Sequence, residues 1–510
     1  MKRSALPAVL AACLAAAILS FPPATRAAQS AADTVRQAPA SSKSPSAFQV
    51  TVGSLDAGPP IRAGFVGITT EYWDMFKEVG TNPSQPDVPF EQVLENLAPD
   101  GGFDLRIGGD TSDWTWWPVP GMARPPWARW TLTPTWMAVA QKLLEDLHAH
   151  LIAGINMEAD NATVAATEVA AIQSGIGPTV PTTFELGNEP ELYPKWPFYI
   201  TKTKQTVFGR PANYSFPQIT SEWDSLASYL GHVRLAGVGY SSFRALPYVR
   251  QFLLASPNLS LLTMHTYALT PQNCQKGGEL RESSLFDLNS LQNLAARVGA
   301  WAALGTAHRV SLRVDEINAV TCGGLPDFSN TMGPALWALN ILPLYAQTGI
   351  TGVNFETRPN TAQNLIQPTA TSTGWQVTVQ PEYYGMLAFA QLTPPGSRIL
   401  SITPMPNGLF AWAVETPTHT VNIVVTNTTS HARRVAIQVA GVKGPANTET
   451  LTDSTGKLTA TAGVTLGGQT ISPQTGQLTG TQARTQVAQR KGVYDITVRP
   501  ASATILSADG

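Results

Sequence analysis

The feature that most constrains the fold is a regular alternation of short apolar runs with amphipathic helical patterns between residue 64 and about residue 392. The apolar runs cover residues 64–70, 103–109, 151–156, 182–188, 234–240, 261–267, 310–318 and 350–356. Helical periodicity follows at 133–150, near 220–231, and at 285–304, 333–347 and 382–392. Eight strand–helix units predict an α/β fold, a closed (β/α)8 TIM barrel over residues 59–396, with a doubly wound sheet as the alternative.

The C-terminal part of the chain has a different pattern. After Pro394 and Pro395 the helical period ends, and alternation typical of strands appears at 409–414, 421–426, 435–439, 492–498 and 503–506. We therefore predict an antiparallel β-sandwich domain over residues 397–510. Residues 47–58 hold another alternating segment, which precedes the barrel and has no partner nearby. We expect it to join the sandwich as an N-terminal strand.

The N-terminus has the pattern of a secretory signal peptide. Lys2 and Arg3 are followed by an apolar run over residues 5–21 and by a small-residue cleavage site at 25–27. This predicts a signal peptide over 1–27, then a disordered leader over 28–46 and a secreted or periplasmic protein. Lipid attachment at Cys13 is the alternative, although apolar sequence continues past Cys13 where a lipidated cysteine normally opens a polar tether.

Charge and composition argue against several classes of partner. The formal net charge is −2, only 13% of the residues are charged, and no basic run occurs, so nucleic acid and anionic membranes are poor partners. No apolar stretch after the leader reaches the roughly 18–20 residues of a membrane span. The seven histidines form no cluster with the spacing of metal ligands. We expect no metal, no cofactor and no membrane span.

Two predicted strands end in carboxylates. Residues 184–190 (FELGNEP) place Glu189 just after the fourth strand, and residues 312–318 (LRVDEIN) place Glu316 at the end of the seventh. In a barrel the carboxyl ends of the strands surround the active-site mouth. Retaining hydrolysis of a glycosidic bond needs one carboxylic acid to protonate the leaving oxygen and a carboxylate about 5–5.5 Å away to attack the anomeric carbon. This pair therefore predicts a retaining β-glycosidase.

Acids at strand ends often have a purely structural role, since they cap the next helix or pair with arginine. Glu185 and Asp315 alternate with the two site residues. We expect these two side chains to point away from the site and to be structural.

Four motifs in order along the chain resemble glycoside hydrolase family 79, the heparanase and β-glucuronidase family of the clan A glycosidases. They lie at predicted strands one, two, four and seven, and read GITTEYW (67–73), LRIGGD (105–110), LGNEPELY (186–193) and DEINAVTCGG (315–324). The Asn-Glu-Pro step alone is common to the clan, whereas the four motifs in order are more specific. The resemblance in layout spans residues 48–510, because these proteins also pair the barrel with a β-domain that takes an N-terminal strand.

The resemblance implies a role for each matching residue. Glu189 would be the general acid/base and Glu316 the nucleophile. Asn188 would hydrogen-bond the sugar 2-hydroxyl, and Tyr267 would orient the nucleophile, with a packed strand aromatic as the alternative for Tyr267. For His265 there are two alternatives. It is a histidine at the barrel rim that is hydrogen-bonded by its neighbours, or it contacts the sugar.

The ends of strands one and two carry further candidate contacts. The resemblance implies that Glu71 and Asp110 bind sugar hydroxyls, and a structural role is the alternative. Trp114, Trp116 and Trp117 follow at once. A tryptophan cluster in a loop above a barrel favours a sugar-stacking wall, with core packing as the alternative.

The loop after the eighth strand departs from the family pattern. In the family this loop recognises the uronate carboxylate, typically with a tyrosine, whereas residues 357–363 (TRPNTAQ) contain none. We expect Arg358 to supply a charge-assisted contact instead. The expected partner is then a carbohydrate, a β-linked glucuronide, and the alternatives are a glucoside, a xyloside or a galactoside.

The cysteines left after the predicted leader form an even pair. Cys274 and Cys322 follow strands six and seven, which are neighbours in a barrel. We predict a disulfide that braces the loop after the nucleophile, with two separate buried thiols as the alternative.

Two rival functions remain on the same fold. A metal-dependent lyase or isomerase would require ligand clusters at the strand ends, and the sequence lacks them. A catalytically inactive carbohydrate-binding protein would keep the tryptophans and lose one of the two glutamates. Both Glu189 and Glu316 are present, so we favour the enzyme.

Overall fold

The fold is described from a computed structural model, which covers residues 47–53, 58–272, 274, 277–403 and 405–509. The predicted signal peptide, the predicted leader and the alternative of lipid attachment at Cys13 lie outside these residues. Within them, no helix is both long enough and apolar enough to cross a membrane.

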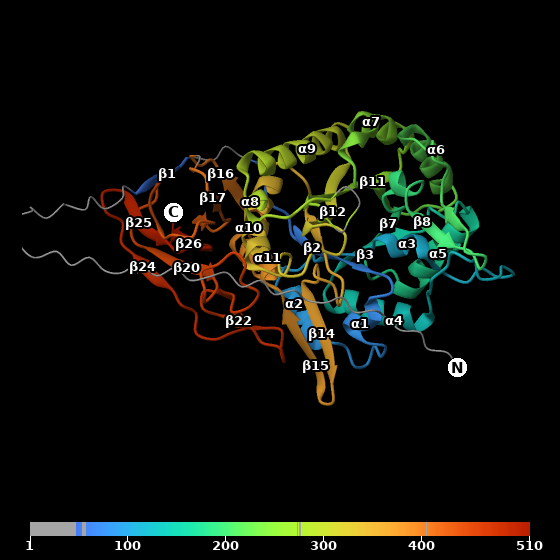
Figure 1. Ribbon diagram of the computed structural model, residues 1–510, viewed down its shortest axis with the longest axis horizontal. Helices are drawn as coiled ribbons and strands as arrows, with labels where there is room; N and C mark the ends of the chain where they lie inside the picture. Colours follow the sequence, from blue (N-terminus) through green and yellow to red (C-terminus); the bar gives the residue numbers. More distant parts are fainter. Residues whose placement is uncertain (1–46, 54–57, 273, 275–276, 404, 510) are drawn as a thin grey trace, which may run out of the picture. The chain divides into compact units, whose positions relative to one another are not determined.

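Eight parallel strands close into a barrel (Figure 1). In chain order they are β2 (Val66–Glu71), β3 (Asp104–Gly108), β6 (His150–Ile155), β7 (Thr182–Leu186), β10 (Leu235–Tyr240), β11 (Leu259–Leu269), β12 (Ser311–Val320) and β13 (Val353–Glu356). The ladder closes between β13 and β2, where Val353 lies opposite Val66. The predicted barrel is confirmed, and the alternative of an open doubly wound sheet is wrong.

The helices between the strands cover the outside of the barrel. The main ones are α2 (Val88–Glu95), α4 (Pro134–Asp146), α5 (Ala162–Ile176), α6 (Phe216–Ala227), α7 (Leu246–Ala255), α9 (Leu288–Ala307), α10 (Met332–Ala346) and α11 (Pro381–Leu392). Local sequence explains their starts. Thr133 caps α4 by accepting a hydrogen bond from Trp136 N, and Pro134 occupies the first turn, where its missing N–H costs nothing.

Shorter elements decorate the mouth of the barrel and the connections. The short helices are α1 (Met75–Val79), α3 (Asp110–Trp114), α8 (Glu282–Leu285), η1 (Pro190–Leu192) and η2 (Phe243–Ala245). Three two-stranded ribbons are β4 (Thr115–Trp116) with β5 (Trp130–Thr131), β8 (Pro197–Ile200) with β9 (Thr206–Phe208), and β14 (Ile366–Thr371) with β15 (Gly374–Val379). These ribbons extend the connections after barrel strands two, four and eight.

The C-terminal domain is a two-sheet sandwich. The larger sheet contains β16 (Arg398–Leu400), β17 (Leu409–Glu415), β18 (Thr420–Asn427), β26 (Ser502–Asp509), β20 (Ala446–Thr452), β21 (Thr465–Leu466) and β24 (Thr485–Val487). The smaller sheet contains β1 (Phe48–Val52), β19 (Arg433–Val439) and β25 (Val493–Val498), and a separate ribbon joins β22 (Thr470–Ile471) to β23 (Leu478–Thr479). Strand β1 pairs in parallel with β19, so the predicted N-terminal strand is confirmed as a member of this domain.

The larger sheet is buried on both faces. One face packs against the smaller sheet through residues such as Val50, Ile423 and Tyr494. The other face belongs to the same apolar cluster as the barrel helices, and the rings of Phe389 on α11 and Trp412 on β17 lie 5.8 Å apart. Strand β18, TVNIVVTN, is accordingly buried on both faces along most of its length.

Candidate active site

Glu189 and Glu316 come together at the carboxyl ends of the barrel strands. Glu316 lies on β12 and is 7% exposed. Glu189 follows β7 in a left-handed backbone conformation, with φ of 46° and ψ of 50°. A non-glycine residue held there costs about 1–3 kcal/mol and persists where the surroundings determine it. The hydrogen bond from Glu189 N to Gly239 O, 3.1 Å long, supplies part of that constraint.

His265 lies between the two carboxylates. Its Nδ1 is 2.8 Å from Glu189 Oε1 and 3.7 Å from Glu316 Oε2. Burial acts to lower the pKa of His265, but the charge of Glu316 and the hydrogen bond to Glu189 outweigh burial and raise the pKa to about 10. The imidazole is therefore a cation that faces both acids. Of the two readings from the sequence, the structure shows a histidine satisfied by its neighbours.

Arg106 places a second buried cation beneath the site. It lies on β3 with 0% exposure, and its Nη1 is 3.1 Å from Glu316 Oε2. Burial acts to raise the pKa of Glu316, yet the charges of His265 and Arg106 dominate and lower this pKa to about 2. Glu316 is thus an ionised carboxylate at any ordinary working pH.

Glu185 and Asp315 do not point away from the site as the sequence predicted. Arg106 Nε lies 2.6 Å from Glu185 Oε2 and 3.2 Å from Asp315 Oδ2, inside the barrel. The register of β12 against β11 shifts where Met264 pairs with Val314 and His265 pairs with Glu316, so Asp315 is an extra residue in the ladder. A bulge of this kind breaks simple alternation. The expectation of a structural role for both acids is not affected by this correction.

Tyr267 joins Glu316 to a third carboxyl group. Its hydroxyl lies 2.6 Å from Glu316 Oε1 and 2.8 Å from Oε2 of Glu356, the last residue of β13. Gln363 Nε2 approaches the same hydroxyl at 3.4 Å. Burial, with the negative charges of Glu316 and Glu71, raises the pKa of Glu356 well above its usual range.

Residues at the ends of strands one, two and four hydrogen-bond one another at the same mouth. Asn188 Oδ1 accepts from Arg106 Nη2 at 2.9 Å, and its Nδ2 donates to Asp110 Oδ1 at 3.2 Å, so both ends of the amide are fixed. Glu71 accepts from Thr111 N at 2.9 Å and from the hydroxyl of the same residue. A Cβ at Gly109, whose φ is 71°, would lie 2.7 Å from the Glu71 carboxylate, so only glycine leaves room for this approach.

Arg358 lies beside these acids. Its Nε is 3.9 Å from Glu71 Oε1 and 3.9 Å from Glu356 Oε1, and the side chain is 29% exposed. Burial raises the pKa of Glu71 to about 7 in spite of the opposing charge of Arg358. Arg358 Nε is buried, and no described residue provides a hydrogen-bond acceptor for it. A guanidinium N–H therefore remains unsatisfied next to the site.

The tryptophans that follow Asp110 do not form one wall. Trp116 is 3% exposed and packs in a small separate core with Trp127 and Phe198. The sequence-based role of Trp116 in sugar stacking is therefore not supported, because the long loops after strands two and four need their own core. Trp114 is partly exposed, and the Arg129 guanidinium stacks 3.6 Å from its ring centroid.

Two sets of side chains in the described part of the chain bring possible metal ligands within 4.8 Å of one another. They are Glu185, His265 and Asp315, and Glu189, His265 and Glu316. Both sets depend on His265, and a protonated imidazole has two N–H donors and no free lone pair. The cluster is thus better suited to holding protons and negative charge than to holding a cation.

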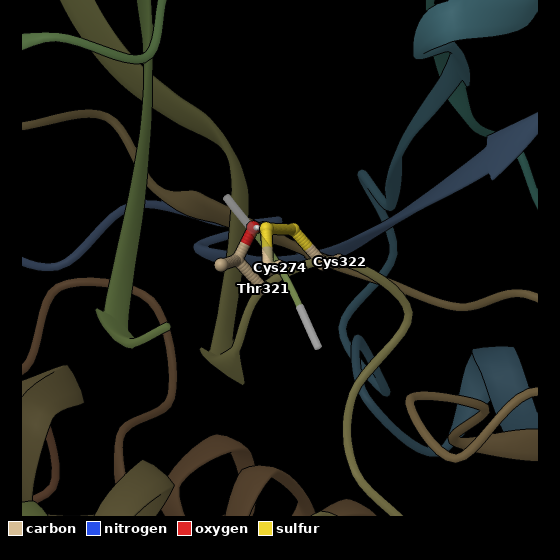
Figure 2. Close-up of a disulfide and its surroundings, with 3 residues drawn as sticks. All are labelled: Cys274, Thr321 and Cys322. Carbon is tan, nitrogen blue, oxygen red and sulfur yellow. Dashed lines mark hydrogen bonds between the residues drawn. A yellow bond between two sulfur atoms is a disulfide. The ribbon is translucent and has the colours of Figure 1, made fainter. Parts of the chain in front are cut away.

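A disulfide joins Cys274 to Cys322, with a Cα–Cα distance of 6.1 Å. Figure 2 shows this bridge beside Thr321, at the loops that follow β11 and β12. The two strands are neighbours in the barrel, so the bridge ties the segment after the Glu316 strand to the segment after the Tyr267 strand.

Three residues of the site were given no role from the sequence: Arg106, Glu356 and Gln363. Signals for the first two were present. Arg106 interrupts an apolar run in a strand buried on both faces, which requires an acidic partner inside the barrel. Glu356 ends an apolar strand in the same way as Glu71. Gln363 reaches the site only through the path of its loop, and no local pattern marks it.

No protein-family model and no curated protein sequence matches the chain. Three solved structures illustrate the folds that it resembles. A 4-O-α-L-rhamnosyl-β-D-glucuronidase from Fusarium oxysporum 12S is 15% identical with a TM-score of 0.68, over 90% of this chain and 100% of that chain. A GH51 arabinofuranosidase from Xanthomonas axonopodis pv. citri is 14% identical with a TM-score of 0.63, over 91% and 100%. A GH30 endoxylanase from Clostridium papyrosolvens C71 is 14% identical with a TM-score of 0.51, over 91% and 100%. At such low identity the likeness establishes a shared fold, the TIM barrel with an additional β-domain.

Proposed function

We propose that the chain is a retaining β-glycosidase in which Glu316 is the nucleophile and Glu189 the general acid/base. The observation that carries this proposal is a distance. One oxygen of Glu189 and one of Glu316 lie within 4.8 Å of each other across His265. Retaining enzymes hold their two carboxyl groups about 5–5.5 Å apart, whereas inverting enzymes need about 6.5–9.5 Å to admit a water.

The assignment of the two roles rests on electrostatics and access. A nucleophile must be ionised, and two cations lower the pKa of Glu316 to about 2. The Glu189 side chain is more open, at 16% exposure against 9% for Glu316. An acid/base must reach the leaving oxygen and then a water molecule.

In the first step, Glu316 attacks the anomeric carbon while Glu189 protonates the departing oxygen. In the second, Glu189 deprotonates a water that releases the sugar.

The neighbouring polar groups are suited to a bound sugar ring. Asn188 is held in one orientation by Arg106 and Asp110, so its amide is fixed before any sugar hydroxyl arrives. Such preorganised donors stabilise a transition state without reorganisation. Asp110 is exposed at the mouth and Glu71 is buried behind it, which supports hydroxyl contacts from Asp110 first.

For the sugar we propose a β-linked glucuronic acid, with Arg358 as the contact to its carboxylate. Arg358 supports this choice, because its side chain is 29% exposed beside the acids of the site and a guanidinium forms charge-assisted hydrogen bonds with a carboxylate. Glu71, with a pKa of about 7, is largely neutral below that pH and does not compete for the guanidinium. The glucuronidase of similar fold named above is in line with the choice, as is the sequence resemblance to family 79. A neutral glycone is the alternative if Glu71 and Glu356 together neutralise Arg358.

The disulfide bears on where the protein works. Disulfides form and persist in oxidising compartments. The bridge between Cys274 and Cys322, together with the signal-peptide pattern of the sequence, supports a secreted or periplasmic enzyme.

A substrate panel tests the function. The p-nitrophenyl β-glucuronide, glucoside, xyloside and galactoside are compared at matched concentration, and the first-formed anomer of the released sugar is observed by proton NMR. We expect the glucuronide to be hydrolysed fastest, with the β-anomer appearing first. A first-formed α-anomer would contradict retention, and a preference for the glucoside would remove the uronate assignment alone.

A further inference from the structure

The hydrogen bonds around Tyr267 contain one more acceptor than the phenol has protons. Tyr267 Oη lies 2.6 Å from Glu316 Oε1 and 2.8 Å from Glu356 Oε2. A phenol has a single O–H and can donate to one oxygen at a time. Two carboxylates facing this hydroxyl would therefore leave one contact with no proton in it. Both contacts are satisfied when one of the two carboxyl groups is protonated and donates to the phenol oxygen.

The surroundings decide which carboxyl group carries the proton. Glu316 faces two cations, Arg106 at 3.1 Å and His265 at 3.7 Å, and both favour its ionised form. Glu356 is 5% exposed and faces the negative charges of Glu316 and Glu71. Among the described residues, the one cation paired with Glu356 is Arg358, at 3.9 Å, beyond hydrogen-bond distance. The proton therefore belongs on Glu356.

We propose that Glu356 is a positioning residue which, as a neutral carboxylic acid, donates a hydrogen bond to Tyr267 Oη, so that the phenol directs its own proton to Glu316 Oε1. The relay runs in one direction, from Glu356 to Tyr267 to Glu316. It fixes the orientation of the nucleophile without adding a negative charge beside it. Gln363 Nε2, 3.4 Å from the same hydroxyl, is a second donor to it.

The relay also explains why a third acid is tolerated near the nucleophile. An ionised Glu356 would repel Glu316 where both side chains are buried, because charges interact more strongly there than in solvent. A neutral acid instead stabilises the ionised nucleophile through the phenol, and its direct hydrogen bond to Glu316 acts in the same sense. This inference rests on the proposed glycosidase function for its kinetic consequence, but the position of the proton does not.

The kinetic test compares Glu356→Gln with Glu356→Ala in the wild type, and repeats Glu356→Ala in a Tyr267→Phe background. Glu356→Gln keeps a donor in the place of the carboxylic O–H, so we expect kcat within about threefold of the wild type and an unchanged acid limb. Glu356→Ala removes the donor, and we expect kcat to fall about tenfold to a hundredfold with KM little changed, as loss of a hydrogen bond next to a charged group implies. In the Tyr267→Phe background the Glu356→Ala change should add less than threefold, because the relay is already broken.

An infrared test observes the proton itself and needs no activity. The wild-type minus Glu356→Gln difference spectrum at neutral pH should contain a protonated-carboxyl C=O band. Glu168→Gln is the matched control. Glu168 is a buried acid on α5 whose pKa burial raises well above its usual range, so its variant should lose a similar band. The activity of the Glu168→Gln variant should stay at the wild-type level.

The outcomes separate this inference from the proposed function. An active wild type, with no band assigned to Glu356 and with Glu356→Gln as damaging as Glu356→Ala, would overturn the relay alone. A wild type without glycosidase activity that still shows the band would overturn the function and leave the proton on Glu356. If Glu356→Ala does not fold, the Gln variant and the difference spectrum still decide.

Discussion

His265 Nδ1 lies 2.8 Å from Oε1 of Glu189, and this contact makes one buried cation common to both carboxylates of the site. The same imidazolium contributes to the low pKa of Glu316. A histidine in this position therefore contacts the proposed acid/base while its charge favours the ionised form of the proposed nucleophile.

Removal of His265 should change the pH dependence of catalysis. Without the cation, the pKa of Glu316 rises from about 2, so the acid limb of kcat/KM should move to higher pH in His265→Gln. The reason is that the nucleophile must be ionised to attack, and loss of a positive neighbour favours its protonated form. His308→Gln is the control, because His308 bonds the Leu304 carbonyl at the end of α9. An acid limb that stays in place would argue against His265 as the source of the shift.

Arg358→Ala should damage binding of a uronide selectively. Loss of a hydrogen bond to a charged group is worth about 1.5–3 kcal/mol, so KM for the glucuronide should rise about tenfold to a hundredfold, with little change for the glucoside. Arg129→Ala tests a further cation near Asp110, which stacks on Trp114 and donates to the Phe198 carbonyl. If Arg129→Ala, and not Arg358→Ala, raises KM for the glucuronide alone, the substrate carboxylate is bound by Arg129. Equal losses on both sugars in Arg358→Ala would give Arg358 a role in loop structure.

The preference for a uronide should depend on pH through Glu71. This carboxyl group has a pKa of about 7, so it is neutral at lower pH and negative at higher pH. Once ionised, it competes with the substrate carboxylate for Arg358 Nε, 3.9 Å away. The ratio of kcat/KM for glucuronide to that for glucoside should therefore fall as pH rises through about 7. In Glu71→Gln the ratio should be flat across this range, and a fall of the same size in that variant would assign the effect to another group.

The disulfide should contribute to stability more than to chemistry. It closes a loop with a sequence separation of 48 residues, and loss of such a bridge typically costs about 2–4 kcal/mol. Cys274→Ser, Cys322→Ser and the double variant should each lower the free energy of unfolding by the same amount in denaturant titrations. A double variant that is much less stable than either single one would mean that each thiol contributes separately.

Much of the fold follows from the periodicity of the chain. All eight predicted barrel strands are present, because strands buried on both faces have dense apolar runs that stand out from their surroundings. Helices α2, α5 and α7 were not predicted. Helix α5, for example, is rich in alanine, so its apolar face contrasts weakly with the rest of the helix. The hairpin of β8 and β9 was also missed, since most of its residues are exposed and follow no strong alternation.

The site could be predicted only as far as strand ends reveal it. Glu189, Glu316 and Tyr267 lie together because each lies in the C-terminal half of a barrel strand or just after it. The inward direction of Asp315 depends on a bulge in β12 that no alternation rule anticipates. The burial of Trp116 depends on Trp127 and Phe198, which come from a different part of the loop and from another loop. Contacts between loops are tertiary, and the local sequence does not encode them.

The most direct test of the two-glutamate account is azide rescue with product analysis. Glu316→Ala and Glu189→Ala are assayed on the p-nitrophenyl β-glycoside that the wild type hydrolyses fastest, and both should lose most activity. Azide should enter the space left at position 316 and attack from the nucleophile side, giving an α-glycosyl azide with inverted configuration. At position 189 azide should attack the glycosyl-enzyme instead, giving a β-glycosyl azide with retained configuration. A β-product from Glu316→Ala together with an α-product from Glu189→Ala would contradict the assignment and exchange the two roles.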